Sequence, residues 1–399
     1  MDNTVQKHID VLDGIRAVAI VLVVWYHFWQ QTWLTPYIVF DNKITKYFGI
    51  SNINLATFVR YGAEFVDMLI LLSAVCNFYP YARSILLGEP WPDTKVFYKK
   101  KAIRIIPSYY LCVFIMLIFA LAEKRYSGMA AMWQDLIARL TFCSIFSERT
   151  YLGSQLNGVL WTVQVEVIYY ILMPWIAKCF KKRPGITCIV MWLCGILSSN
   201  FILYQKADRI RFYVNHFLTF AGCYANGMLI CMIYITVKKQ KAENRYTEIL
   251  AVLMTVVSVI AIDRLFAEHS NSDQVQIVQL EHRFLLSLAF SAFILAIMFG
   301  TKWLKAMFAN RIMRFISTIS YNLYIWHQVI AVKCKEYKIP YWEGEKPPNM
   351  TGDRVWQWKY QIMIILFSLS VAMIVTYLFE RPVSNFLKRC ERKKVLERK

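Results

Sequence analysis

Long apolar runs alternate with short charged loops along this chain. About ten runs approach 20 residues, the length of an α-helix that crosses the hydrocarbon core of a bilayer. Because lipid offers no hydrogen-bond partners to the backbone, such runs predict an all-α, polytopic integral membrane protein. The predicted spans cover residues 11–31, 61–82, 105–122, 159–177, 186–204, 214–237, 249–263, 285–301, 315–332 and 361–380.

The pattern leaves no stretch for a separate soluble domain. It predicts one membrane domain over residues 1–385, followed by a basic tail over residues 386–399. The first run has neither a strongly basic leader nor a small-residue cleavage site, so we expect it to be retained as a span. The loop over 123–158 is partly apolar and is expected to hold a short interfacial helix.

Positive charge is distributed unevenly between the two sets of loops. Lys and Arg are about twice as dense on the side that holds the N-terminus, which predicts cytoplasmic N- and C-termini in a plasma-membrane protein. The formal net charge of +20 mostly reflects this bias. No basic stripe with base-stacking aromatics stands apart from the membrane ends, so nucleic acid is not an expected partner. The ten cysteines lack metal-ligand spacing, and no metal is expected.

Two ionisable residues inside the first span, Arg16 and His27, are the most informative feature of the sequence. Such residues are costly within a bilayer and mark candidate functional sites. Their separation of eleven positions is close to three helical turns, which predicts one shared face and a distance of roughly 16 Å along the axis. Asp13 lies on the same face, next to Arg16.

The predicted topology gives each of the other polar residues a depth in the bilayer. These residues fall into two layers, and the first span connects the two. The outer layer holds the carboxylic acids and imidazoles His27, Asp67, Glu166, His216 and His327. The inner layer holds the cations Arg16, Lys100, Lys101 and Arg104. Each has a structural alternative. The inner cations can be snorkelling side chains, and His216 and His327 can belong to an interfacial aromatic belt. Asp67 can start a helix, Glu166 can form a structural ion pair, and His27 can simply pack between helices.

Five segments, in this order, resemble the acyltransferase family 3 membrane proteins, which include O-acetyltransferases of bacterial surface polysaccharides and peptidoglycan. They are Leu12 to Arg16 with His27, Gly62 to Ser73, Lys100 to Tyr109, Leu160 to Glu166 with Pro174, and Ser320 to His327; Glu380 to Pro382 resembles the family's ending. Ala17 and Ala74 replace usual glycines. Lys100 and Lys101 replace arginines, so the planar fork for bidentate phosphate contacts is missing there.

The resemblance implies transfer of an acyl group, usually acetyl, from cytoplasmic acyl-CoA to a hydroxyl of a cell-surface or lipid-linked glycan. The donor's phosphates suit the inner cations, so Arg16, Lys100, Lys101, Arg104 and Tyr109 are expected to bind acyl-CoA. A neutral His27 is expected to be the general base, oriented by Glu166 or Asp67. No serine or cysteine is clearly poised as a nucleophile, which favours direct transfer over an acyl-enzyme.

Other functions stay open at this stage. A transporter or flippase of glycans or lipid-linked precursors explains the spans and the intramembrane charges equally well. Heparan-type N-acetyltransferases begin with a similar helix, so the acceptor could be an amine. A structural scaffold would leave the Arg16–His27 face without a purpose. The acyl chain, the acceptor and the oligomeric state are left open.

Overall fold

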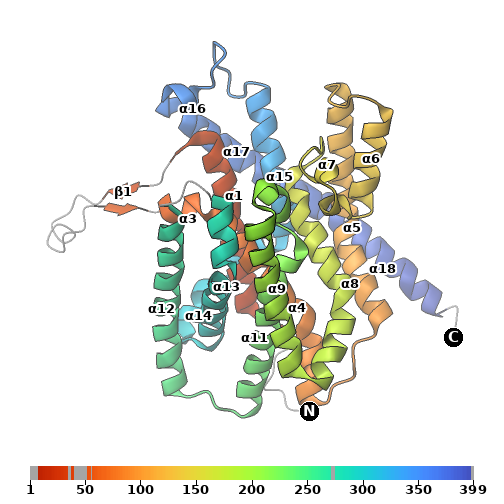
Figure 1. Ribbon diagram of the computed structural model, residues 1–399, viewed down its shortest axis with the longest axis vertical. Coiled ribbons are helices and arrows are strands. Elements are labelled where there is room, and N and C mark those ends of the chain that lie inside the picture. Colours follow the sequence, from red (N-terminus) through yellow and green to blue (C-terminus); the bar gives the residue numbers. More distant parts are fainter. Residues whose placement is uncertain (1–7, 35–36, 40–51, 55, 271–274, 397–399) are drawn as a thin grey trace.

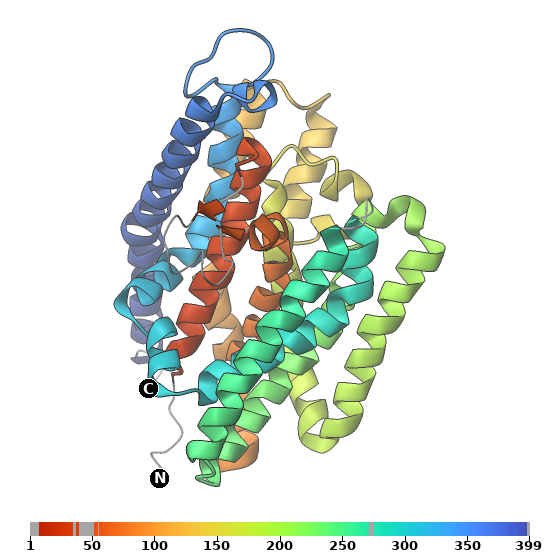
Figure 2. The same cartoon turned by 90° about the vertical axis from the view of Figure 1, so that its left-hand side faces the viewer.

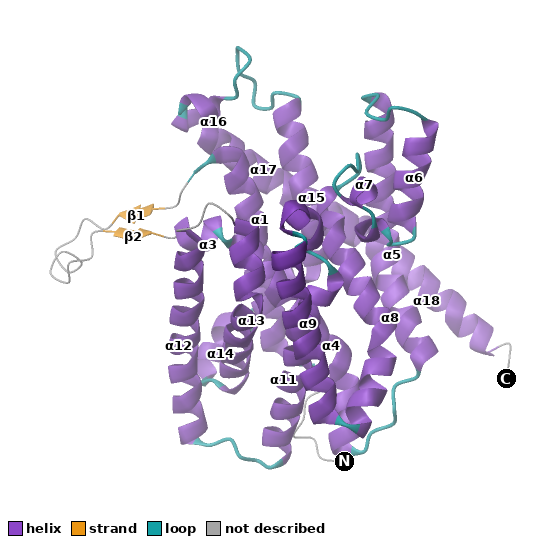
Figure 3. Cartoon of the chain, in the orientation of Figure 1, coloured by secondary structure: helices purple, strands orange, loops and turns teal. Residues whose placement is uncertain are grey.

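The computed structural model describes residues 8–34, 37–39, 52–54, 56–270 and 275–396. These residues form a helical bundle, with one small two-stranded hairpin projecting from it (Figures 1 and 3). Nine helices of this described part are long and apolar enough to cross a membrane. The prediction of an all-α polytopic membrane protein is therefore confirmed.

The elements follow one another with mostly short connections. The long helices are α1 (Asp10–Thr32), α4 (Phe65–Leu87), α5 (Thr94–Ala122), α8 (Trp161–Lys182), α9 (Pro184–Gln205), α11 (Ala221–Lys239), α12 (Arg245–Ser270), α13 (Val275–Phe299), α15 (Arg311–Glu336), α17 (Arg354–Ile374) and α18 (Arg381–Leu396). The shorter elements are β1 (Tyr37–Val39), β2 (Asn52–Asn54), α3 (Ala56–Arg60), η1 (Gly62–Glu64), α6 (Met129–Leu140), η2 (Ser144–Phe146), α7 (Glu148–Tyr151), η3 (Gly158–Leu160), η4 (Ala207–Arg209), α10 (Ile210–Tyr213), η5 (Phe217–Phe220), α14 (Lys302–Phe308), α16 (Pro348–Thr351) and the π-helical η6 (Val375–Glu380). Strands β1 and β2 pair antiparallel.

Helix α4 lies at the centre of the bundle. It packs against α1, α8, α11 and α13, and most of its residues are buried. On one side α1 packs against α15, which in turn packs against α17 (Figure 2). Helices α9 and α12 are the most exposed candidate spans, so their apolar side chains face lipid once the bundle is in a membrane.

Small residues let the central helices approach one another closely. A Cβ atom added to Gly227 of α11 would lie 2.6 Å from the Cβ of Ala74 in α4. Ala74 stands where the resembling family usually has glycine, and the facing Gly227 preserves the close approach. At Gly14 of α1, an added Cβ would lie 2.0 Å from the carbonyl oxygen of Phe308, so α14 can pack against α1 only because residue 14 is glycine.

Each predicted span corresponds to a helix. Nine of them lie in the nine apolar helices, and the span predicted over 315–332 lies in α15. Several boundaries differ, most of all at the start of α5 and at the start of α13, which begins at Val275 and not at residue 285. Helix α5 begins at Thr94, well before residue 105, because Asp93 caps it by accepting a hydrogen bond from the Val96 amide at 2.8 Å. Helix α12 is longer than the span predicted over 249–263. The loop over 123–158 carries α6 and α7, which confirms a helix there.

The start of α1 and the end of α18 lie toward the same end of the molecule in both views (Figures 1 and 2). An even number of crossings produces this arrangement. The assignment of that end to the cytoplasm remains the prediction from the charge bias. Of the basic tail, residues up to 396 continue α18, and residues 397–399 lie outside the described part.

Candidate active site

A pocket of about 760 Å³, here named the cationic pocket, opens at the end of the bundle where α1 begins. Seven cationic side chains among the described residues line it, against the two carboxylates of Asp13 and Glu380. The cations are Arg16, Lys99, Lys100, Arg104, Arg314, Arg381 and Lys388. Such an excess of positive charge in a concave site favours a polyanionic ligand.

Helix α5 and the π-helical η6 both contribute to the wall of the cationic pocket. Lys100 and Arg104 are four positions apart on α5, so both reach the pocket from one face. The wider turn of η6 brings Thr376 and Glu380 to the pocket, and π-helical turns are frequent at functional sites. Glu380 Oε2 accepts a hydrogen bond from Asn322 Nδ2 at 2.6 Å, which ties η6 to α15.

A narrower pocket of about 100 Å³, here named the narrow pocket, adjoins the cationic pocket inside the bundle. The two pockets share the side chains of Arg16, Arg104 and Tyr321. From there the narrow pocket extends between α1, α4, α8 and α15 to Tyr324, with Glu166 on its wall. A charged entrance is thus followed by a thin, mostly apolar passage.

Glu166 is held by hydroxyl groups from α4 and α8. Ser73 Oγ donates to Glu166 Oε1 at 2.6 Å, and the Tyr170 hydroxyl donates to the same oxygen. Asn77 Nδ2 donates to Ser73 Oγ at 3.1 Å, and Asn77 Oδ1 accepts from Lys101 Nζ. Lys101 also lies 4.6 Å from the centroid of the Tyr170 ring. Lys101 therefore belongs to this network and does not line the cationic pocket.

His27 of α1 lies against a second histidine, His327 of α15. The Nε2 atom of His327 is 3.1 Å from Nδ1 of His27, and the ring centroids are 4.9 Å apart. His327 is fully buried, whereas His27 is partly exposed. The two side chains come from helices that pack along each other.

The hydrogen-bond partners of the two histidines show which ring nitrogen of each carries the hydrogen. His327 Nδ1 contacts the carbonyl oxygens of Leu323 at 3.1 Å and Tyr324 at 2.7 Å. Carbonyls only accept, so this nitrogen carries the hydrogen, and Nε2 of the neutral ring is an acceptor. His27 Nδ1 then faces two acceptors, His327 Nε2 and the Val23 carbonyl oxygen at 3.0 Å, and must carry its own hydrogen. The basic lone pair of His27 is consequently on Nε2.

Comparison with known proteins gives the context of these residues. The family described as "Acyltransferase domain" matches residues 9–381, which include the narrow pocket, the histidine pair and most of the residues that line the cationic pocket. The chain belongs to this family.

Individual relatives have low sequence identity to this chain. Proteins named "Putative O-acetyltransferase" from Staphylococcus aureus strains COL, MSSA476 and N315 are each 22% identical over 363 residues. Each match covers 86% of this chain and 53% of the relative, so the chain spans about half the length of these curated relatives. No solved structure matches the chain.

The carboxylate of Asp67 is engaged in a buried ion pair. Arg283 Nε of α13 donates to Asp67 Oδ2 at 3.1 Å, and the side chains are only 2% and 1% exposed. Arg283 Nη1 also donates to the Val214 carbonyl oxygen and to Thr219 Oγ1, each at 2.6 Å. This arrangement fastens α4 to α13 and to the segment before α11, so its evident effect is structural.

Tyr109 lines neither the cationic nor the narrow pocket. Its buried hydroxyl donates to the Arg139 carbonyl oxygen at 3.1 Å and accepts from Gln164 Nε2 at 3.0 Å. The side chain thereby joins α5 to α6 and α8. His216 precedes η5, and its ring lies at a tilt against Phe217, with 4.7 Å between the ring centroids.

Glu166 and His27 lie at different depths in the bundle, although the sequence predicted the same depth for both. Asn157, just before η3 and α8, donates through Nδ2 to the Ile325 carbonyl oxygen at 2.7 Å, two residues from His327. The chain therefore enters η3 and α8 level with the histidine pair. Glu166 follows nine residues later and lies about 13 Å deeper. The hydrogen-bonding neighbour of His27 is His327, where a carboxylate was expected.

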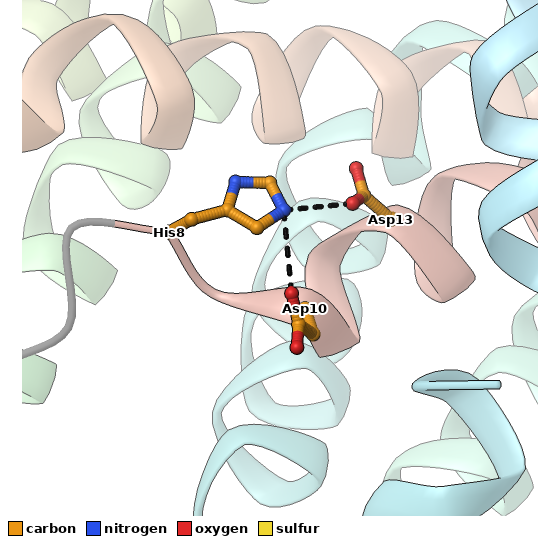
Figure 4. A group of neighbouring side chains, drawn as sticks. All are labelled: His8, Asp10 and Asp13. Atoms are coloured by element: carbon orange, nitrogen blue, oxygen red, sulfur yellow. Dashed lines mark hydrogen bonds and ion pairs between the residues drawn. The ribbon is translucent and has the colours of Figure 1, made fainter.

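Three titratable residues lie together at the N-terminal end of α1 (Figure 4). His8 Nε2 is 2.8 Å from Asp13 Oδ2 and 3.5 Å from Asp10 Oδ1. Asp13 Oδ1 also accepts a hydrogen bond from Ser317 Oγ at 3.2 Å. Carboxylates in the first turn of a helix are favoured by its dipole, and the exposed His8 pairs with them. The helix dipole and the contacts with His8 account for this group, and we assign no metal to it.

Proposed function

We propose that this protein is a membrane O-acyltransferase of the plasma membrane. It takes an acyl group, expected to be acetyl, from cytoplasmic acyl-CoA and transfers it to a hydroxyl of a cell-surface or lipid-linked glycan. The observation that carries the proposal is the adjoining pair of pockets, which share Arg16, Arg104 and Tyr321. Membership of the acyltransferase domain family and the name of the staphylococcal relatives support it.

Acyl-CoA suits the two pockets in charge and in shape. Its nucleotide end carries several phosphates, for which Lys100, Arg104 and Arg381 offer charge-assisted hydrogen bonds. Its thin arm suits the narrow pocket, whose volume of about 100 Å³ excludes the nucleotide. An arm that passes Tyr321 brings the thioester toward Tyr324, whose carbonyl oxygen binds His327.

The chemistry requires one base. His27 Nε2 removes the proton of the acceptor hydroxyl while that oxygen attacks the thioester carbonyl carbon. The carbon–sulfur bond then breaks, and the CoA sulfur leaves as a thiol after taking the proton back from His27. His327 keeps His27 in the required tautomer, as the third member of a catalytic triad does for its histidine. Glu166 is a positioning residue that shapes the narrow pocket and balances the charge of Lys101.

Reconstituted protein with labelled acetyl-CoA on one side of the membrane and a glycan extract on the other tests the proposal. We expect acetyl-CoA to bind, acetylpantetheine, which lacks the nucleotide phosphates, to bind far more weakly, and free CoA to appear only with an acceptor present. Label on a glycan oxygen is the expected product. Movement of a glycan across the membrane without thioester consumption would overturn the proposal in favour of a transporter, and label on nitrogen would make the acceptor an amine.

A further inference from the structure

A second polar pocket, of about 200 Å³, lies at the opposite end of the bundle from the cationic pocket. It is formed by the turn between α5 and α6, by the first half of α6 and by the loop that contains α7 (Figure 1). From Lys100 in the cationic pocket to its last residue Ala122, helix α5 rises by roughly 33 Å, which separates the two pockets. We name this pocket the distal pocket. Its lining residues include Tyr126, Gln134, Asp135, Arg149 and Gln155.

The distal pocket contains a buried carboxylate with one unused oxygen. Asp135 is 5% exposed, and its Oδ2 accepts from the Tyr126 hydroxyl at 3.0 Å, Ser154 Oγ at 3.0 Å and the Gln155 amide at 2.9 Å. Within the described ranges of the chain, Asp135 Oδ1 has no hydrogen-bond partner. An unpaired buried carboxylate oxygen is costly, so a hydroxyl group that reaches Asp135 Oδ1 would be bound favourably.

Arg139, one helical turn further on, adds a second charge behind that wall. Its side chain is fully buried, and its Nε donates to Ser154 Oγ at 3.3 Å. Neither terminal nitrogen of Arg139 finds a partner in the portion of the chain that is described. The opposite charges of Asp135 and Arg139 offset each other, Arg149 adds a positive charge to the lining, and the Gln134 and Gln155 amides offer both donors and acceptors. This mixture favours a ligand with several hydroxyl groups over a simple ion.

The distal pocket is fixed to the helix that carries His327. Asn157, two residues after Gln155, donates to the Ile325 carbonyl oxygen of α15 at 2.7 Å. On the other side of the pocket, Arg125 donates to Glu336 of α15 at 2.9 Å. These two contacts lie on either side of His327 along α15. A ligand in the distal pocket is therefore held in a fixed relation to the histidine pair.

We propose that the distal pocket binds one sugar ring of the glycan that accepts the acyl group. Its volume of about 200 Å³ is below the roughly 300–1,000 Å³ of pockets for drug-sized ligands, so a single ring fits and its neighbours stay outside. Sugar hydroxyls donate to Asp135 Oδ1 and exchange hydrogen bonds with the Gln155 amide. The Tyr126 ring offers an apolar surface to one face of the sugar. The role as acceptor rests on the proposed function.

Binding of simple sugars to the full chain in lipid nanodiscs tests this proposal. The probes are the methyl glycosides of glucose, galactose, N-acetylglucosamine and glucuronic acid, and a disaccharide of each, followed by saturation-transfer NMR. We expect at least one glycoside to bind saturably. Asp135→Asn should weaken it by about tenfold or more, because an amide N–H replaces the accepting oxygen. Gln155→Ala should also weaken binding, and it keeps the backbone amide that Asp135 needs. Asp208→Asn, the same change at a side chain 77% exposed, is the control.

The outcomes separate this proposal from the proposed function. No binding of any probe by the wild type, or equal binding by Asp135→Asn, would overturn the sugar site. If Asp135→Asn does not fold, Gln155→Ala and Gln134→Ala decide. Tighter binding of a disaccharide than of its glycoside indicates a glycan chain as the source of the ring, and equal binding indicates a free sugar. Acetyl-CoA binding is measured on the same samples. If the wild type binds a glycoside but does not bind acetyl-CoA, only the assignment of the donor is contradicted.

Discussion

His27 Nδ1 donates a hydrogen bond to His327 Nε2 across 3.1 Å, joining the two helices that flank the narrow pocket. His327 is fixed in turn by the carbonyl oxygens of its own helix. The two imidazoles therefore form one unit in which His327 supplies orientation and His27 supplies the basic nitrogen.

The first prediction concerns His27. His27→Ala removes the proposed base, and acyl transfer should fall by roughly 100-fold or more while acetyl-CoA binding and folding are kept. His216→Ala, at a histidine whose ring lies against Phe146 and Phe217, should leave turnover nearly unchanged. Rates measured on purified, reconstituted variants check this. Near-normal turnover of His27→Ala would remove this residue from the mechanism.

The second prediction concerns the tautomer. In His327→Gln the amide oxygen can still accept from His27 Nδ1, so kcat should fall by about tenfold or less. His327→Phe keeps the ring shape but has no acceptor, and kcat should fall as far as in the His27 variant, with KM for acetyl-CoA little changed. Equal rates for the two variants would show that His327 only fills space.

The third prediction concerns the cationic pocket. Replacing Lys100 and Arg104 together with Gln should weaken acetyl-CoA binding by tenfold or more, since each charge-assisted hydrogen bond is worth about 1.5–3 kcal/mol. The weakening should be much smaller with acetylpantetheine. Lys95→Gln, at an exposed lysine in the first turn of α5, is the matched control. An unchanged acetyl-CoA affinity would support the snorkelling interpretation of these cations.

The fourth prediction concerns Asp67. Asp67→Asn leaves the buried Arg283 guanidinium without its counter-charge and should lower the free energy of unfolding by about 3–5 kcal/mol. Adding Arg283→Met should restore part of it, because the stranded charge is gone. Thermal unfolding of the single and double variants measures the coupling. A stable Asp67→Asn protein with lost turnover would instead place Asp67 in the chemistry.

The fifth prediction concerns acid stability. Hydrogen bonds from Lys333 and Tyr337 lower the pKa of Glu123, at the end of α5, from 4.5 to about 2. A group with a lowered folded-state pKa stabilises the fold above pH 4.5, and this contribution is lost as the pH falls toward 2. The thermal midpoint of Glu123→Gln should therefore depend less on pH over this range than that of the wild type. Glu343→Gln, at an exposed loop residue, should behave like the wild type.

Sequence periodicity predicted the fold well, because bilayer thickness sets the length of each apolar run. The run over 315–332 is predicted as a span although α15 is not among the nine apolar helices of the described chain. Its polar side carries Asn322 and His327, which are fully buried. The boundary of α5 was missed because its first turns are charged, and hydropathy cannot detect a helix that continues out of the lipid.

The site could be predicted only in part. The spacing of Arg16 and His27 indicates one helix face, and both lie on α1. The contact between His27 and His327 joins residues 300 positions apart, so local patterns do not reveal it. The depth of Glu166 was misjudged because we assumed that every span starts at one height, whereas the chain enters α8 beneath the segment that carries α6 and α7.

The polarity of α15 also bears on how the chain enters the membrane during synthesis. A segment this polar partitions poorly into lipid on its own. Asn322 donates to Thr376 Oγ1 at 2.8 Å and to Glu380 Oε2 at 2.6 Å, and these two partners are synthesised some fifty residues later. We therefore expect α15 to wait at the translocation channel until α17 and η6 emerge, and to insert with them as a unit. A chain truncated after α15 should leave that helix accessible to labels in the aqueous phase, whereas the full chain should protect it.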